Sequence, residues 1–122
     1  MQFNVLIRQL AERLKLPALV VGPDGRCAIR FDDVVVRFSH APAADAFDLS
    51  ARIGAVDLGD PEVVDALEAL RESSAAACWD SSGQVSLRQR FWLAALSLPH
   101  FVRALERFVD QTEHWRRRLG AR

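Results

Sequence analysis

The sequence predicts an α+β fold, in which a twisted and mostly antiparallel sheet carries helices packed on one face. Residues 26–54 hold three runs of alternating apolar and polar residues, and a period of two is typical of strands with one buried face. Segments with apolar residues at helical spacing flank these runs and close the chain. An apolar sheet face needs a cover, which the helices provide. The predicted order is helix, three strands, helix, two strands, helix.

Length and composition indicate a single domain that spans residues 1–122. Apolar residues make up 50% of the chain and charged residues 26%, which is typical of a globular protein with a core. The sequence has no run of about 18 apolar residues, so it predicts no membrane insertion. Arg8, Glu12 and Arg13 interrupt the first apolar segment, which excludes the apolar part of a signal peptide.

The net charge is zero, but the charges are unevenly distributed. Residues 1–80 contain eight basic and thirteen acidic side chains, a balance of −5, whereas residues 81–122 contain eight basic and three acidic, a balance of +5. This separation suits a protein that meets a partner or its own copy. Charges scattered over helix surfaces are the alternative explanation.

The chain begins with an amphipathic helix that we expect to end before Pro17, because the residue before a proline avoids the helical conformation. Its apolar positions are Phe3, Leu6, Ile7, Leu10 and Leu14. Residues 19–21 form a short apolar run that predicts a small additional strand. Residues 22–25 are four turn-forming residues in a row.

Three strands are expected at residues 27–31, 34–38 and 47–53, and Asp32 and Asp33 connect the first two as a tight hairpin. Val35 interrupts the polar face of the second strand, which therefore carries valine on both faces. Such a strand is either buried on both sides or binds an apolar partner on one of them. Burial of both faces is difficult in a single-sheet domain of this length, so we favour an apolar partner on one face.

A helix is expected from residue 60 to about residue 72, with Asp60 as its cap and Pro61 in its first position. Its apolar face is broader than a short helix needs for its own core, and consists of Val63, Val64, Leu67 and Leu70. We therefore expect a homodimer that buries this surface in a two-fold contact.

Residues 75–79 predict a fourth strand, although their alanines also suit a longer helix. Residues 85–93 alternate as a long fifth strand, whose outward face is interrupted by Trp92. The last helix is expected to begin at Ser97 and to end at Gly120. Its apolar stripe has steps of three and four residues, and consists of Phe101, Leu105, Phe108, Thr112, Trp115 and Leu119, widened by Val102 and Val109.

The sequence holds no pattern typical of catalysis or of a metal or cofactor site. Cys27 and Cys78 lie in apolar, strand-like runs, so we expect two buried, reduced thiols that react slowly. The histidines, His40, His100 and His114, have no spacing that ties them to a cysteine or to one another. We therefore expect no catalytic residue, no metal ligand and no cofactor.

A nucleic-acid-binding domain is an alternative that depends on five arginines, Arg88, Arg90, Arg116, Arg117 and Arg118. Three of them end the last helix, where they complement the helix dipole. Because no aromatic residues are interleaved with them and no glycine-rich phosphate loop is present, we expect no nucleic-acid partner.

The ordered set of segments resembles the class I chaperones of bacterial type III secretion systems, the family that includes the Tir chaperone. The resemblance covers nearly the whole chain and depends on these segments: LIRQLAERLKL, GPDGRCAIRFDD, VVVRF, FDLSARIG, DPEVVDALEAL, DSSGQVSLRQRF and FVRALERFVDQTEHWRRRL. The last of them is the closest match, with the family's Phe-Val and Trp-Arg pattern. Members of the family are usually acidic, whereas this chain is neutral and its last third is basic.

The resemblance implies a cytoplasmic homodimer that binds an effector near the effector's N-terminus and keeps it extended and ready for export. The secretion-system ATPase is a further candidate partner. We expect the effector to bind between the first helix and the outer strands, at Val5, Leu14, Val34, Val35, Val36 and Phe38. We expect the dimer interface at Val63, Val64, Leu67, Leu70 and Trp92. A regulatory adaptor of the same fold is the alternative.

Overall fold

The computed structural model describes residues 1–17, 19–73 and 77–121. The elements follow the order α1 (Phe3–Arg13), β1 (Arg26–Phe31), β2 (Val34–Ala41), η1 (Pro42–Ala44), β3 (Ala46–Ala55), α2 (Pro61–Ser73), β4 (Ala77–Trp79), β5 (Gln84–Trp92), η2 (Leu93–Ala95) and α3 (Leu98–Arg118), where η1 and η2 are short 3-10 helices. This order confirms the predicted α+β fold class. Within the described ranges, no helix combines the length and the hydrophobicity that crossing a bilayer requires.

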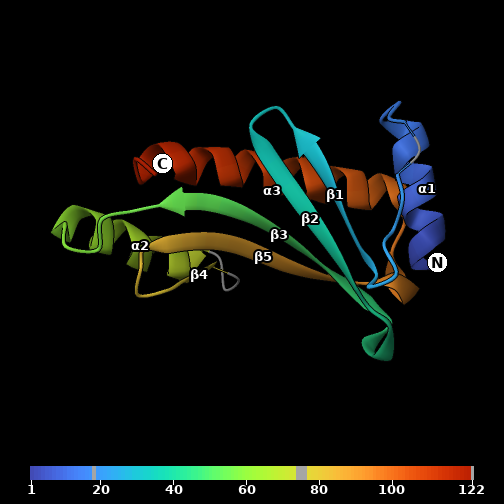
Figure 1. Cartoon of the computed structure of the whole chain (residues 1–122), viewed down its shortest axis with the longest axis horizontal. Helices are drawn as coiled ribbons and strands as arrows, with labels where there is room; N and C mark the ends of the chain where they lie inside the picture. Colours follow the sequence, from blue (N-terminus) through green and yellow to red (C-terminus); the bar gives the residue numbers. More distant parts are fainter. Residues whose placement is uncertain (18, 74–76, 122) are drawn as a thin grey trace.

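The five strands form one sheet in the order β1-β2-β3-β5-β4, and every neighbouring pair is antiparallel. The predicted hairpin is confirmed, since β1 ends at Phe31 and β2 begins at Val34. Asp32 adopts a φ of 53°, a conformation that aspartate tolerates better than most residues. The sheet is strongly twisted, so that the β1–β2 hairpin and the β4 end point in different directions (Figure 1).

The apolar face of the sheet is covered by helices. α3 runs along the sheet, α1 lies at the end where α3 begins, and α2 lies at the opposite end beside β4 (Figure 1). A cluster of phenylalanines joins the layers: the ring of Phe101 from α3 lies 5.3 Å from Phe47 in β3 and 5.2 Å from Phe91 in β5, edge to face in both pairs. Phe3 brings α1 into the same cluster, 5.5 Å from Phe47.

The middle helix contributes to this core as well. Leu67 and Leu70 are fully buried in the same apolar cluster as the residues of α1 and α3. α2 therefore completes the cover of the sheet at its β4 end, together with α1 and α3.

The predicted helix boundaries are largely confirmed. The Asp60 carboxylate accepts a hydrogen bond of 2.9 Å from the backbone N–H of Glu62 and so caps α2. Ser97 occupies the cap position of α3, but its hydroxyl lies 2.8 Å from His100 Nδ1 and makes no bond to the backbone of the helix. Gly120, with a φ of 60°, ends α3 in a Schellman arrangement.

Two local predictions differ from the structure, and a third falls partly outside the described residues. Residues 19–21 form no strand, and their leucine and second valine pack against the core from a loop. β4 comprises Ala77–Trp79, and the first two residues of the predicted strand, 75 and 76, lie outside the described residues. β5 ends at Trp92, and Leu93 begins the 3-10 helix η2.

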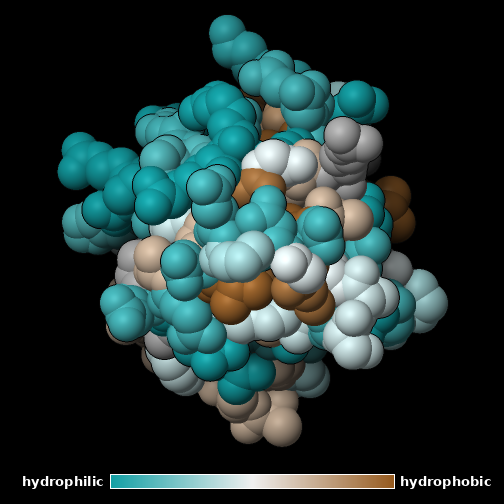
Figure 2. Space-filling view, turned by 90° about the vertical axis from the view of Figure 1, so that its left-hand side faces the viewer, coloured by the Kyte–Doolittle hydropathy of each residue, from teal (hydrophilic) through white to brown (hydrophobic). Residues whose placement is uncertain are grey.

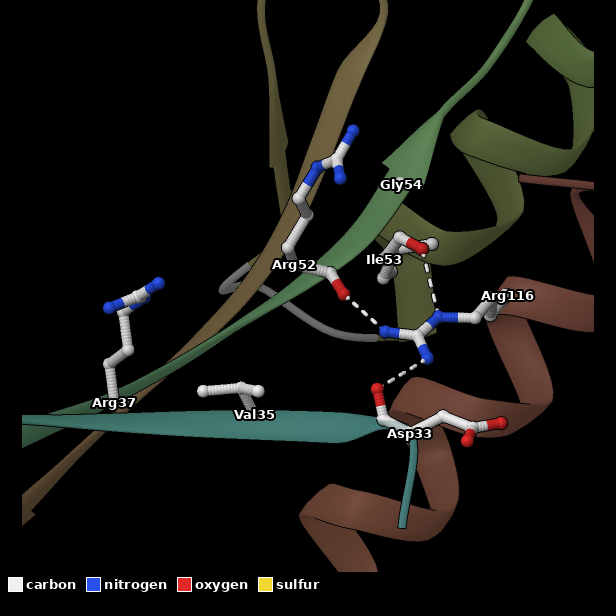
Figure 3. A pocket seen from close by; sticks show the side chains of 7 residues that line it. All are labelled: Asp33, Val35, Arg37, Arg52, Ile53, Gly54 and Arg116. Carbon is white, nitrogen blue, oxygen red and sulfur yellow. Dashed lines mark hydrogen bonds between the residues drawn. The ribbon is translucent and has the colours of Figure 1, made fainter. Parts of the chain in front are cut away.

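Arg116 of α3 locks an irregular point of β3. The pairing of β3 with β5 shifts register between Arg52 and Gly54, which leaves Ile53 as an extra residue. The Arg116 guanidinium donates three hydrogen bonds there: to the carbonyl of Arg52 at 2.8 Å, to that of Ile53 at 3.1 Å, and to that of Asp33 in the β1–β2 hairpin at 3.1 Å (Figure 3). One side chain thus ties a helix, a bulge and a hairpin together.

We expect Arg116→Met to lower the free energy of unfolding by about 1–3 kcal/mol, because three backbone carbonyls lose a charged donor while the apolar stem is kept. Urea denaturation followed by circular dichroism measures the change. Arg117→Met is the matched control, since Arg117 is exposed and neighbours Arg116 on the same helix. Equal stability of the two variants would contradict the locking role.

Candidate functional site

An apolar groove lies where the end of α1, the end of β1 and the middle of α3 meet. Leu14, Phe31, Val102, Leu105 and Val109 line it, and its volume is about 430 Å³. Leu14, Phe31 and Val109 are each half-buried, so they pack against the core and still present apolar surface to the groove. Partly exposed apolar side chains in one concave site are suited to bind apolar side chains of a partner.

The groove has an acidic rim. Asp32 lies at the end of β1, and Glu106, Asp110 and Glu113 follow along one side of α3 at spacings of four and three residues. The site therefore combines an apolar floor with negative charge at its border. It is suited to a segment that carries apolar side chains with lysine or arginine beside them.

The edge of the sheet lies beside this groove. β1 pairs with β2 on one side, and on its other side it has no strand within residues 1–17, 19–73 and 77–121. Unpaired backbone groups on an edge strand can accept an additional strand. A partner in extended conformation can thus place alternate side chains toward the groove while its backbone bonds to β1.

The structure separates the residues that the sequence assigns to effector binding. Leu14 lines the groove, and Val5 is half-buried on α1. Val34, Val36 and Phe38 have no exposed surface in the subunit. Val35 points to the opposite face of the sheet, where 39% of its surface is exposed.

Sequence reasoning did not place Phe31, Val102 and Val109 in the site. Val102 and Val109 did widen the apolar stripe of the last helix, and that excess is the signal that could have identified them. Their meeting with Leu14 and Phe31 depends on how α3 crosses α1 and β1, which no local pattern encodes.

The residues assigned to the dimer interface also lie apart. Val64 on α2 has 39% of its surface exposed, and Val63 lines a hollow beside Val56 and Leu119. Small apolar areas are visible on this end of the molecule within a mostly polar surface (Figure 2). Trp92, with 60% of its surface exposed, lies at the far end of β5, roughly 26 Å along the strand from Gln84.

The two cysteines differ in environment, and the expectation of two buried thiols is wrong for one of them. Both are free. Cys27 faces the core side and is half-buried, and burial raises the pKa of its thiol to about 11. Cys78 points to the other face and is exposed, with its sulfur 3.8 Å from the carbonyl oxygen of Ser86. The strand alternation places Cys78 outside, which an apolar neighbourhood in sequence did not reveal.

The histidines have structural contacts. His40 stacks on Phe3 with the ring centres 4.6 Å apart, His100 contacts the Ser97 hydroxyl, and His114 lies edge to face with Trp115. In the part of the chain that the structure describes, no group of three or more His, Cys, Asp or Glu side chains is arranged to hold a metal ion.

Most of the chain matches the model of a known protein family. The model of the Tir chaperone protein (CesT) family matches residues 5–116. No curated protein sequence is significantly similar to this chain.

Solved structures share the fold. A chain in the crystal structure of the ExsC–ExsE complex is 24% identical, with a TM-score of 0.80 over 95% of this chain and 92% of that one. A chain in the HopA1–SchA chaperone–effector complex is 19% identical, with a TM-score of 0.75 over 94% and 93%. A chain in the complex of the Yersinia pestis type III secretion chaperone SycH with a YscM2 fragment is 18% identical, with a TM-score of 0.72 over 92% and 98%.

We expect Cys78 to react with iodoacetamide far faster than Cys27 at pH 8. With a pKa of about 11, only about a thousandth of the Cys27 thiol is ionised at that pH, and burial hinders access further. As long as the pH is below the Cys27 pKa, each increase of one pH unit should raise the alkylation rate of Cys27 about tenfold. Mass spectrometry of labelled peptides over time measures both rates, and unfolded protein is the control. Equal rates in the folded protein would contradict the assigned environments.

Proposed function

The chain belongs to the Tir chaperone protein (CesT) family of type III secretion chaperones, and we propose that it binds the N-terminal segment of a secreted effector and keeps that segment extended and export-competent. The observation that carries the proposal is the acid-rimmed apolar groove beside the open edge of β1. An extended client can use both at once.

The groove and the edge of β1 bind different parts of the client. Backbone hydrogen bonds to β1 hold a client strand without regard to its sequence, and alternate side chains of that strand enter the apolar site. Both interactions require an extended client, because a folded one exposes neither its backbone nor its apolar side chains. The site therefore favours the unfolded form of the client by mass action, without nucleotide hydrolysis.

The acidic rim of the groove indicates which charged residues a client should carry. Four carboxylates surround the groove, so an apolar segment with adjacent lysine or arginine residues binds better than an acidic one. Leu14 and Val5 stay in the proposed contact surface. Val34, Val36 and Phe38 are fully buried and lie in the core, and Val35 is a candidate contact for a client that continues onto the other face.

We also propose a homodimer. Leu67 and Leu70 of the predicted apolar face are buried within the subunit, whereas Val64 is exposed, and this exposed valine supports the proposal. A two-fold contact through α2 would bury Val64 and Val63 against the same residues of the second subunit. β4 pairs with residues 85–87 of β5, so the interface would include Trp92 only if it also reached the part of β5 that continues beyond β4. Family membership alone supports a cytoplasmic location and the secretion-system ATPase as a further partner.

Val109→Asp should weaken client binding about tenfold or more while the protein stays folded, because the charge replaces a half-buried apolar contact and adds to an acidic rim. The client is first identified by co-purification from the native host, and its N-terminal segment is then titrated calorimetrically against each variant. Leu105→Asp is the contrast, since Leu105 is 2% exposed and its replacement should unfold the domain.

Val35→Asp makes the same change on the opposite face and distinguishes the two possible binding faces. If Val35→Asp weakens binding and Val109→Asp does not, the client lies on the other face of the sheet and the groove assignment is wrong. If no co-purified protein binds to wild type in the titration, the chaperone function itself is wrong.

Val64→Glu should convert the proposed dimer into a folded monomer, because two buried carboxylates would face each other across the two-fold axis. Sedimentation velocity at micromolar concentration measures the mass. Val20→Glu is the control, since Val20 is 82% exposed in a loop and the same change there should leave the dimer intact. A monomeric wild type would rule out the interface.

A further inference from the structure

The face of the sheet that no helix covers is an arginine-rich surface, which we call the arginine face. By strand alternation it carries six exposed arginines, Arg26, Arg30, Arg37, Arg52, Arg88 and Arg90. They come from β1, β2, β3 and β5. Among the acidic residues near them are Asp48 in β3 and Asp24 in the turn before β1.

Three of the arginines already have partners within the subunit. Arg90 binds the Asp48 carboxylate through two hydrogen bonds of 2.8 and 3.1 Å, and these bonds hold the pKa of Asp48 below its usual value. Arg52 donates to the side-chain oxygen of Gln84 at 2.9 Å, and Arg30 donates to the carbonyl of Asp32 at 2.8 Å. Asp48 is therefore held mainly by Arg90, and Arg88 contributes a weaker charge interaction with it.

The other three arginines have free guanidinium groups. The side chains of Arg26, Arg37 and Arg88 make no hydrogen bond or ion pair with any residue that the structure describes. All three line one hollow of about 690 Å³ across the sheet. Their planar donors are thus available for carboxylates of a partner.

The floor of this hollow consists of small side chains. The strand register aligns Ala28 with Arg37, Arg37 with Ser50, and Ser50 with Arg88. Arg37 and Arg88 are therefore two strands apart, roughly 10 Å, with only a serine between them. Because alanine and serine are short, a peptide backbone can approach the sheet between the two guanidinium groups.

A second hollow continues from the first one. Arg37 borders it too, together with Arg52, and Val35 lies between Arg37 and the Asp33 end of β2 (Figure 3). This second hollow offers the exposed Val35 beside Arg37 and Arg52, and it is also lined by Asp33 and by Arg116, whose guanidinium is bonded to backbone carbonyls. An acidic segment with a single apolar residue would match both hollows.

We propose that the arginine face binds an extended acidic segment of a partner protein. Charge complementarity carries the proposal: three arginines without a side-chain hydrogen bond to any described residue and one carboxylate, Asp24, line the same shallow hollow, so the hollow is basic although the net charge of the chain is zero. A zero net charge disfavours nucleic acid, which is attracted by strongly basic domains over long distances. Carboxylates on a short peptide need only the local match.

The arginine face and the client groove have opposite chemistry and lie on opposite faces of the sheet. The groove is apolar with an acidic rim, and the arginine face is basic. The proposal for the arginine face does not depend on the proposal for the groove. It would let the subunit hold an acidic segment while a different, apolar segment occupies the groove.

The test uses a fluorescent peptide of about eight alternating Glu and Ser residues, long enough in extended form to cross the roughly 19 Å of a five-stranded sheet. Fluorescence anisotropy should show binding to the wild type at about 50 mM salt and clear weakening at about 300 mM, as screening predicts. Bound peptide should also slow alkylation of Cys78, which lines the same hollow.

Arg37→Glu combined with Arg88→Glu should weaken binding at least about tenfold. Arg103→Glu combined with Arg107→Glu is the matched control, because it makes the same charge change at exposed sites on α3 and should alter binding less than about twofold. Circular dichroism verifies that both variants fold; if the first does not, Arg37→Gln with Arg88→Gln replaces it.

Two results would overturn the proposal. One is equal loss of binding in both charge-reversal variants, which would mean that only net charge matters. The other is tighter binding of a single-stranded DNA of matched charge than of the acidic peptide, which would assign the surface to nucleic acid. Neither result involves the client, so this test and that of the chaperone function fail separately.

Discussion

The sheet has one face that must be covered and one that must not, and the rest of the structure depends on this difference. Alternation along β1, β2, β3 and β5 sends apolar side chains to one side and mostly arginine and serine to the other. Three helices pack on the apolar side, joined by the phenylalanine cluster around Phe47 and Phe101. A helix on the other side would have to bury unpaired guanidinium groups, which is costly. The second face therefore stays open.

Both binding surfaces result from this arrangement. The helices do not quite cover the apolar face, and where α1 ends, Leu14 and Val109 remain partly exposed over the groove beside the β1 edge. The open face keeps the arginines for an acidic partner. The charges that border each binding surface do not follow the division of the sequence into an acidic and a basic part. Arg26 and Arg37 of the basic surface come from the acidic first part, and Glu106 and Asp110 of the acidic rim come from the basic last part.

Much of the fold could be predicted because its signals are local. Two examples are the hairpin at Asp32 and Asp33 and the start of α2 at Asp60. Each depends on a few neighbouring residues, and both predictions are confirmed. Predictions failed where burial depends on distant segments. Residues 19–21 resemble a strand in composition but lie in a loop, and Cys78 lies in an apolar run yet points outward. Only Leu14 of the effector-binding set was placed in the groove, since the other lining residues are distant in sequence.

The sequence by itself determined the element order, the face that most strand residues take, and the family, because periodicity, caps and turns depend on residues a few positions apart. The tertiary structure alone decided which elements meet. It brought Leu14, Phe31 and Val109 to one groove, and it placed Arg116 of α3 on three carbonyls of a bulge and a hairpin. Such contacts depend on the crossing of helices over a twisted sheet, a geometry set by packing of the whole core and not by any single segment.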